Sequence, residues 1–360
     1  MRSVVWLEIE STTQKVCGVI SITLNFFLIY LILAKSPPKL GGYKWLMLYT
    51  YLFEWAYACL NFFVGPSMHN YNSVCMVFQD MNKVWFGHGV AEFLVVVYCS
   101  FFGSSIAIFA VHFIYRYGAV NLDFRQKYLS GAKQVFLYIC PIGCGVFWGL
   151  TVWYFMSESE VKSDYLRDHM MQKFGLKIEE CAYIALYFWP VDNSGNVYPE
   201  QLSFLGVVIM YIILGVTFFC VIYFGINCYR WISRKLGNME NVSQAAKSLQ
   251  IQLFYALLIQ AAIPCVLMYL PAAMIFTCPM LNIDLDLKYP FIGVTIAIYP
   301  VIDPFPTILI IKSYRRGCID LLTCRRKKNQ IAVGYGIDSF AGGGRGASGS
   351  NTHNHILTSF

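Results

Sequence analysis

The chain has 360 residues, of which 57% are hydrophobic, 17% are aromatic and only 13% are charged. An ordinary soluble domain is about a quarter charged, so this composition excludes one and predicts a protein embedded in a membrane. The net charge of +7 fits a basic cytoplasmic face and does not imply a nucleic-acid partner.

Seven apolar stretches are each near or above the roughly 20 residues that cross the hydrocarbon core of a bilayer. They predict an all-α membrane protein, a seven-transmembrane-helix bundle within residues 1–324, with spans at residues 16–34, 45–64, 90–115, 135–154, 204–229, 253–278 and 291–311. Lys and Arg side chains accumulate on the cytoplasmic side of a membrane. Of the 27 Lys and Arg residues, 19 lie in the links before spans two, four and six and in the segment after span seven. This split predicts that the amino terminus lies outside and the carboxyl terminus in the cytoplasm.

Polar side chains near the midpoints of spans one, two and seven predict a buried cluster of Asn25, Glu54 and Asp303. A carboxyl group in hydrocarbon is unfavourable by roughly 2.5–3.5 kcal/mol, so it must face protein or water. Two interpretations are open. The three groups satisfy one another's hydrogen bonds, or their rearrangement switches the bundle between two states.

Prolines mark where the last two spans can bend. Pro264 and Pro271 lie in span six, and Pro304 follows Asp303 in span seven. Proline removes a backbone donor and kinks a helix. We therefore expect both spans to be kinked, and a bend in span six can open the inner face.

The third span carries candidate functional residues at both of its ends. His88 and Glu92 are four residues apart, on one helical face at the outer end, and they are either ligand contacts or a local helix pair. Tyr115, Arg116 and Tyr117 end the same span at the inner side. Arg116 is either a plain cytoplasmic anchor or a group that reaches into a cytoplasmic cleft.

The longest outer segment, residues 157–203, is expected to hold a charged helix followed by a strand and a turn, with a hairpin as one form. Tyr183 in that strand is a third candidate ligand contact if the segment covers the mouth of the bundle; a tolerated insertion is the alternative. Cys75 and Cys181 are the two cysteines of the outer segments. A disulfide between them and two free thiols are equally compatible with the sequence.

After the last span, residues 313–324 can form a short amphipathic helix on the membrane surface, where Cys318 and Cys324 are placed for palmitoylation. Residues 325–360 are rich in glycine and polar side chains, so we expect a disordered cytoplasmic tail. The sequence shows no metal-ligand set, no cofactor motif and no soluble catalytic signature. We therefore expect neither an enzyme nor a cofactor.

Motifs along nearly the whole chain share their order and spacing with a known family. They are KLGGYKWLM at 39–47, PSMH at 66–69, VHFIYRY at 111–117, LQIQLF at 249–254, IQAAIP at 259–264, YPVIDP at 299–304 and IIKSYR at 310–315. With these motifs the sequence resembles the nematode seven-transmembrane chemoreceptors of the Str class, the class that contains the worm diacetyl odorant receptor.

The resemblance implies a G-protein-coupled receptor for a small odorant or pheromone, with a heterotrimeric G protein and arrestin as partners, in the ciliary plasma membrane of a chemosensory neuron. It implies G-protein coupling at residues 115–117, where the acidic residue of the rhodopsin-like triplet is absent. Any inactive-state lock therefore cannot pair Arg116 with that carboxylate. Asp303 and Pro304 look like the proline motif of the last helix. An odorant-gated seven-helix channel subunit is the alternative, although it requires an amino terminus inside the cell.

Overall fold

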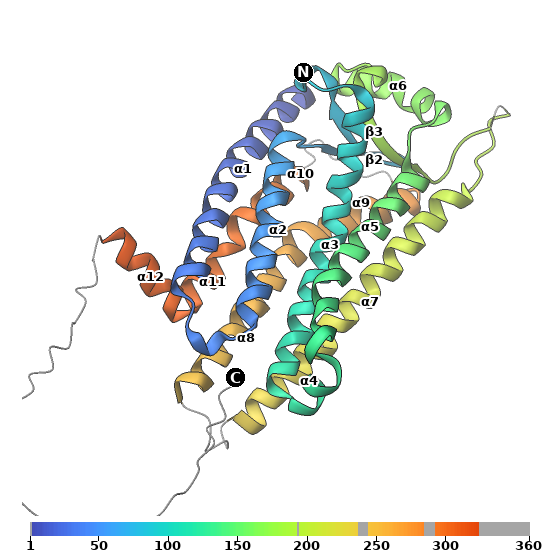
Figure 1. The fold of residues 1–360 in the computed structure, drawn as a ribbon. Helices are drawn as coiled ribbons and strands as arrows, with labels where there is room; N and C mark the ends of the chain where they lie inside the picture. The colour runs from blue at the N-terminus through green and yellow to red at the C-terminus, as the bar shows by residue number, and fades with distance from the viewer. Residues whose placement is uncertain (1, 193, 237–243, 284–291, 324–360) are drawn as a thin grey trace, which may run out of the picture.

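The computed structural model describes residues 2–192, 194–236, 244–283 and 292–323. Within these residues, seven segments run lengthwise as a helix bundle (Figure 1). They are α1 (Arg2–Lys35), α2 (Tyr43–Phe63), α3 (His88–Val120), α5 (Phe136–Met156), α7 (Gln201–Trp231), α8 with α9 (Gln244–Pro264 and Leu270–Met280), and α10 with α11 (Ile292–Ile302 and Pro304–Ile310).

Six of the described segments are long and apolar enough to cross a membrane, and the seventh is α2. Its 21 residues make a helix about 30 Å long, which equals the thickness of the hydrocarbon core. Its hydropathy is lowered by polar side chains such as Glu54 and Asn61, which are buried inside the bundle. Because α2 packs against α1 and α3, it is the seventh helix of the bundle, and the predicted fold is confirmed.

A three-stranded antiparallel sheet covers the outer end of the bundle. Strands β1 (Ser67–Tyr71) and β2 (Val74–Asp80) come from the segment before α3, and β3 (Cys181–Tyr187) comes from the segment before α7. Helix α6 (Glu160–Phe174) packs on the face of the sheet that is turned away from the bundle (Figure 1). We call the sheet and α6 the outer cap. The helix and strand expected within 157–203 are present, but β3 pairs with β2 rather than within its own segment, and the β1–β2 hairpin is an unpredicted addition.

The two cysteines of the sheet lie on opposite faces, because successive side chains of a strand point in opposite directions. Cys75 packs with side chains of the bundle, whereas Cys181 packs with the side chains that face α6. In the strand register Cys75 is opposite Leu186, and Cys181 is opposite Asp80 at the far end of β2. Both thiols are free. Of the two alternatives that the sequence left open, the structure has two free thiols and no disulfide between Cys75 and Cys181.

The last two membrane segments are broken at the positions that the prolines indicate. Between Pro264 and Pro271 the chain forms a π-helical turn, Cys265–Tyr269. In the last segment, α10 ends before Asp303 and α11 begins at Pro304. Isolated π-helical turns are rare and occur frequently at functional sites. The expected kinks are therefore present in both segments.

Two short helices lie at the inner end of the bundle (Figure 1). Helix α4 (Leu122–Tyr128) follows α3, and α12 (Lys312–Leu322) follows α11 and packs against α1. Helix α12 corresponds to the helix expected at 313–324. Cys318 packs against the inner hydrophobic cluster, and its palmitoylation stays a prediction. Cys324 and the tail expected at 325–360 lie outside the described residues.

Candidate functional site

Two small cavities lie between the outer cap and the core of the bundle, with volumes of about 10 and 30 Å³. Both are lined by Phe102, Trp148, Ala272 and Phe276. The larger cavity also reaches the inner face of the sheet, and the smaller one reaches α7. We call these two cavities the outer pocket. A cavity this small holds about one water at most, so a ligand must displace side chains when it enters.

The hydroxyl groups that line the smaller cavity already have partners. Tyr269 OH lies 3.1 Å from Ser105 Oγ, and Tyr211 OH lies 2.7 Å from Thr277 Oγ1. The remaining lining side chains of this cavity are apolar. The outer pocket therefore suits a small apolar ligand, and a polar atom on that ligand can exchange with one of these two hydroxyl pairs.

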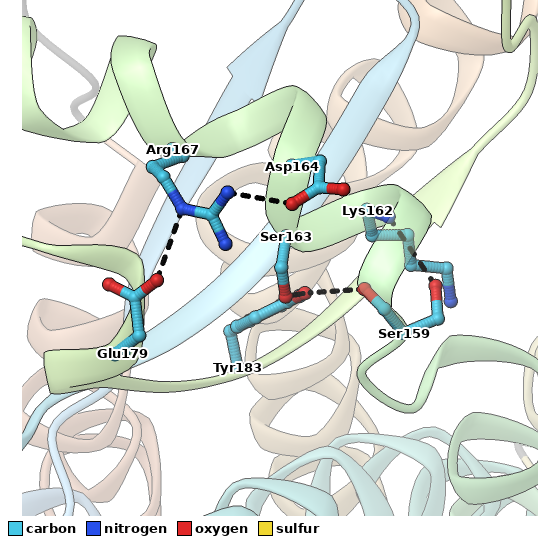
Figure 2. Close-up of polar contacts among 7 residues, drawn as sticks. All are labelled: Ser159, Lys162, Ser163, Asp164, Arg167, Glu179 and Tyr183. Carbon is cyan, nitrogen blue, oxygen red and sulfur yellow. Dashed lines mark hydrogen bonds and ion pairs between the residues drawn. The ribbon is translucent and has the colours of Figure 1, made fainter.

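None of the three predicted ligand contacts lines the outer pocket. Tyr183 points from β3 toward α6, where its OH lies 2.7 Å from Ser163 Oγ (Figure 2). His88 Nε2 lies 3.3 Å from Glu158 Oε1. Glu92 lines a separate groove of about 420 Å³ between α3 and α5, among side chains exposed on the outside of the bundle. The alternation of β3 turns Tyr183 away from the bundle, so the structure assigns it a different environment from the one expected.

His88 and Tyr183 instead contact Glu158, a residue that was not predicted, and these contacts help to hold the outer cap together. Glu158 Oε1 accepts a hydrogen bond from the backbone N–H of Tyr183 at 2.9 Å, and His88 contacts the same oxygen. Burial raises the pKa of the Glu158 carboxyl, although the hydrogen bond from Tyr183 and the charge of His88 oppose the shift. The contacts join α3 to β3 and to the segment that leads into α6. Their role here is structural.

Gln260 of α8 joins three membrane segments at the centre of the bundle. Its Nε2 donates to Tyr51 OH at 2.7 Å and to Asp303 Oδ2 at 3.1 Å, and its Oε1 accepts from Thr307 Oγ1 at 3.2 Å. All four side chains are buried. Sequence reasoning gave Gln260 no role, because a single amide in an apolar span has no local partner that reveals its function. Its place on the face that meets span seven is set only by packing.

One carboxyl oxygen of Glu54, Oε2, and one of Asp303, Oδ1, are buried and have no hydrogen-bond partner among the described residues. Asn25 Nδ2 bonds to Ser21 of its own helix at 3.0 Å and reaches Pro300 O at 3.5 Å. The hydrogen bonds of Asn25 go to Ser21 and Pro300 and not to either carboxyl group, so the expected cluster of three stays a prediction, whereas Gln260 of span six does join Asp303.

The π-helical turn connects this polar network to the outer pocket. Gln260 lies one helical turn before Pro264, which immediately precedes the π-helical turn. Tyr269, the last residue of the π-helical turn, lines the smaller cavity. A ligand that moves Tyr269 therefore acts on the same ten-residue stretch, residues 260–269, that carries Gln260.

At the inner end, α3 places Arg116 inside the protein, with only 2% of the residue exposed. Its Nη1 donates to Gln250 Oε1 of α8 at 2.7 Å, and its guanidinium carbon lies 3.7 Å from the centre of the Tyr43 ring. Among the described residues Arg116 forms no ion pair with a carboxylate. A neutral amide thus links α3 to α8, which agrees with the absence of the acidic residue from the triplet.

The tyrosines on either side of Arg116 have structural partners. The Tyr115 ring packs 5.3 Å from the Tyr43 ring, and Tyr117 OH accepts a hydrogen bond from Asn121 Nδ2 at 2.9 Å. Tyr43 is held in turn by His112, whose Nδ1 lies 2.9 Å from Tyr43 OH. This buried histidine fixes the ring on which Arg116 stacks, and it is a second residue that sequence reasoning missed.

Comparisons with known proteins agree on one family. A family profile described as serpentine type 7TM GPCR chemoreceptor Str matches residues 10–319. The Caenorhabditis elegans G-protein coupled receptor str-217 is 30% identical over 311 residues, which cover 86% of this chain and 88% of that protein. Serpentine receptor class r-10 of the same organism is 26% identical over 336 residues, covering 92% and 95%. The crystal structure of squid rhodopsin matches the fold with a TM-score of 0.57 at 11% identity, over 91% of this chain and 89% of the other.

Proposed function

Since the chain belongs to the Str family of serpentine seven-transmembrane G-protein-coupled chemoreceptors, we propose that it binds a small odorant or pheromone in the outer pocket and activates a heterotrimeric G protein. The observation that carries the proposal is the stretch 260–269. One end of this stretch joins the central polar network, and the other end lines the outer pocket. Binding and the central network therefore share one structural element.

The proposed mechanism is a shift between two states of the bundle. A ligand shifts such an equilibrium only by its difference in affinity for the two states. The odorant favours the state in which Tyr269 is displaced and the segment of α8 bends at the π-helical turn. The inner end of α8 then moves away from α3, and the hydrogen bond between Gln250 and Arg116 breaks. The opened cleft beside Arg116 receives the carboxyl end of a Gα subunit.

The walls of the outer pocket define the class of ligand. Apolar and aromatic side chains make up nearly all of its surface, and burial of apolar surface contributes about 25 cal/mol per Å². A small volatile or an excreted metabolite with few polar atoms fits these walls better than a charged amine or a sugar.

The receptor is a multi-pass membrane protein, as its family and its apolar helices indicate. We place it in the ciliary plasma membrane of a chemosensory neuron, with arrestin as a second partner of the inner face. The family is one of receptors and not of enzymes. No feature of the described residues favours the alternative of an odorant-gated channel subunit.

The proposal is tested in cells that express the chain with a promiscuous Gα subunit. Calcium and cyclic nucleotides are recorded across a panel of small volatiles and nematode metabolites. Ala272 lines both cavities, so Ala272→Val adds two methyl groups to the outer pocket and is expected to weaken or abolish the response. Arg116→Ala is expected to abolish it at the inner end. Tyr183→Phe alters a residue outside the pocket and is expected to respond like the wild type.

Surface expression of every variant is measured in parallel, so that a lost response is not mistaken for lost protein. An odorant response that is equal in Ala272→Val and in the wild type would show that the ligand binds elsewhere. A fast current that persists without any G protein would contradict the receptor mechanism and favour a channel.

A further inference from the structure

A cavity of about 120 Å³ lies at the inner end of the bundle, on the opposite side of the membrane from the outer pocket. Its walls come from the link between α1 and α2, the end of α3, α4 and the turn after it, and the first part of α8. The polar side chains that line it are Lys39, Tyr43, Arg116, Arg125, Gln134 and Gln250, together with Tyr115. We call it the inner cavity.

Arg116 is one of the residues that line the inner cavity, and two of its donors have no partner among the described residues. A guanidinium group has five N–H donors in a planar fork. Nη1 bonds to Gln250, but Nε and Nη2 are buried and have no partner among the described residues. A buried charge without a counter-ion is strongly unfavourable. The unused donors therefore indicate a ligand that brings negative charge and several acceptor oxygens.

Two further cations line the same cavity. Lys39 and Arg125 are exposed side chains that contribute to its wall. None of the described residues that line it is acidic. Cations gathered in a cleft raise the local concentration of anions, and the charges of Arg116 and Arg125 together exceed the single charge of a carboxylate. The balance of charge favours an anion with more than one negative charge.

We propose that the inner cavity binds a phosphate monoester. Such a group carries about −1.5 to −2 charge and three acceptor oxygens at neutral pH, and the fork of an arginine matches its oxygens two at a time. The cavity lies on the cytoplasmic side, where basic pockets between transmembrane helices bind phosphorylated lipid head groups. The same chemistry is offered by soluble inositol phosphates, so the experiment below has one arm for each source.

A phosphate in this cavity has a structural consequence at the inner end. It neutralises Arg116 and connects the end of α3 with Lys39 of the α1–α2 link and with Arg125 of α4. These three elements are then held together by charge-assisted hydrogen bonds, which are roughly twice as strong as neutral ones. The inference does not depend on the odorant or on the outer pocket, because it concerns only the inner face.

The test uses the full-length chain in nanodiscs of neutral phosphatidylcholine and follows its Tm. The probes are inorganic phosphate, soluble inositol trisphosphate, and nanodiscs that also contain phosphatidylinositol bisphosphate. A ligand that binds only the folded state raises the Tm. We expect the wild-type Tm to rise with the lipid probe, the soluble inositol phosphate or both, and the response to identify which source supplies the phosphate.

Two variants of α4 make the test specific. Arg125→Gln removes a charge from the inner cavity, and we expect its half-effective probe concentration to rise by about tenfold. Lys127→Gln removes a charge from the same helix but not from the cavity, and we expect it to match the wild type. Both residues are exposed, so neither substitution is expected to unfold the chain. The proposal is wrong if no probe raises the wild-type Tm, or if the two variants respond alike.

Discussion

The two ends of the bundle are closed in different ways. At the outer end, seven residue pairs join β2 to β3, and three apolar side chains of α6 pack on the outer face of the sheet. On the surface of α6, Arg167 also contacts two carboxylates, those of Asp164 and Glu179 (Figure 2). At the inner end, the contact between α3 and α8 that involves Arg116 is one hydrogen bond to Gln250, and the inner cavity lies beside it.

This difference indicates which end moves. The outer cap opens only when many backbone hydrogen bonds and a packed apolar face are lost together. A single hydrogen bond between side chains contributes about 1 kcal/mol net, so the polar link between α3 and α8 breaks at a much smaller cost, although Phe113 and Phe254 also pack between these two helices. In the proposed mechanism, a ligand held under the cap therefore transmits its effect inward, through the π-helical turn and Gln260, rather than outward.

The largest effect is expected from a substitution that weakens the outer cap. Phe78 is 1% exposed on the face of β2 that meets α6, and its ring lies 5.6 Å from the Phe174 ring. Phe78→Ala is expected to destabilise the protein by about 3–5 kcal/mol, seen as a lower Tm of the purified chain. Val161→Ala on the exposed side of α6 is the control and is expected to change little. An unchanged Tm in Phe78→Ala would refute the rigid cap.

The next largest loss of stability is expected at the centre of the bundle, where the proposed mechanism couples the outer pocket to the inner face. Asp303→Ala removes one acceptor of Gln260 Nε2, which keeps its hydrogen bond to Tyr51 OH, so we expect a loss of about 1 kcal/mol. Asp303→Asn keeps an oxygen that accepts the hydrogen bond from Gln260 Nε2, so we expect a smaller loss. Thermal unfolding of both variants separates the two cases. Equal losses would show that the charge of Asp303, and not its hydrogen bonds, stabilises the bundle.

An effect on stability of similar size is expected at the inner contact, with a larger effect on signalling. Gln250→Ala removes the hydrogen bond that links α8 to Arg116, at a cost of about 1 kcal/mol. We expect agonist-independent nucleotide exchange on the G protein to increase, because the closed inner face loses a contact that the open one lacks. Gln244→Ala changes an exposed residue at the start of α8 and serves as the control. Unchanged basal exchange in Gln250→Ala would contradict a lock at this position.

The smallest effect is expected from acid on the outer cap. His69 Nε2 of β1 lies 2.9 Å from His169 Nε2 of α6, and the ring of His169 stacks on Tyr71. Burial, followed by the charges of Lys173 and His169, lowers the pKa of His69 well below its ordinary value of 6.5. When the outer cap opens and exposes His69 to solvent, this side chain binds a proton more readily than it does in the closed cap. The contact between His69 and His169 is therefore stable above pH 6.5 and weakens as the pH falls below that value.

Hydrogen exchange of β1 and α6 at neutral and mildly acidic pH measures this effect, after correction for intrinsic exchange rates. We expect faster exchange in acid for the wild type. His69→Gln keeps a hydrogen-bonding side chain that does not titrate, and its exchange is expected to lose that dependence. The same acid response in both proteins would exclude His69 as its source.

The helices were predictable because a membrane imposes a length and an apolar composition on each span. The breaks at Pro264, Pro271 and Pro304 were also predictable, since proline removes a backbone donor and kinks a helix interior, although Pro141 lies within the continuous helix α5. The short helix and strand of the outer segment were also predictable, from the charged run and from the alternation before residue 190. These features are local, and local sequence decides them.

The ligand site was not predictable from the sequence, for three physical reasons. A side chain such as Phe102 or Ala272 has the same character whether it lines a cavity or fills a core. The direction of Tyr183 depends on the register of β3, and a shift of one residue reverses every side chain of a strand. The hairpin that carries Cys75 has no strong turn signal, so the position of this thiol relative to Cys181 could not be inferred.

The central claim, that the inner face opens around Arg116 while the outer cap stays closed, is tested most directly by two distances between spin labels. Because the chain has 13 cysteines, the labels are attached to a genetically encoded ketone amino acid. One pair joins Lys127 of α4 and Ala245 of α8; the other joins Trp85 and Val161 at the outer end. All four positions are exposed.

Both distances are measured before and after nucleotide-free heterotrimeric G protein is added. The account predicts that the inner distance lengthens by several ångströms in the complex, while the outer distance stays the same. An inner distance that is unchanged in a verified complex, or an outer distance that changes as much as the inner one, would contradict it.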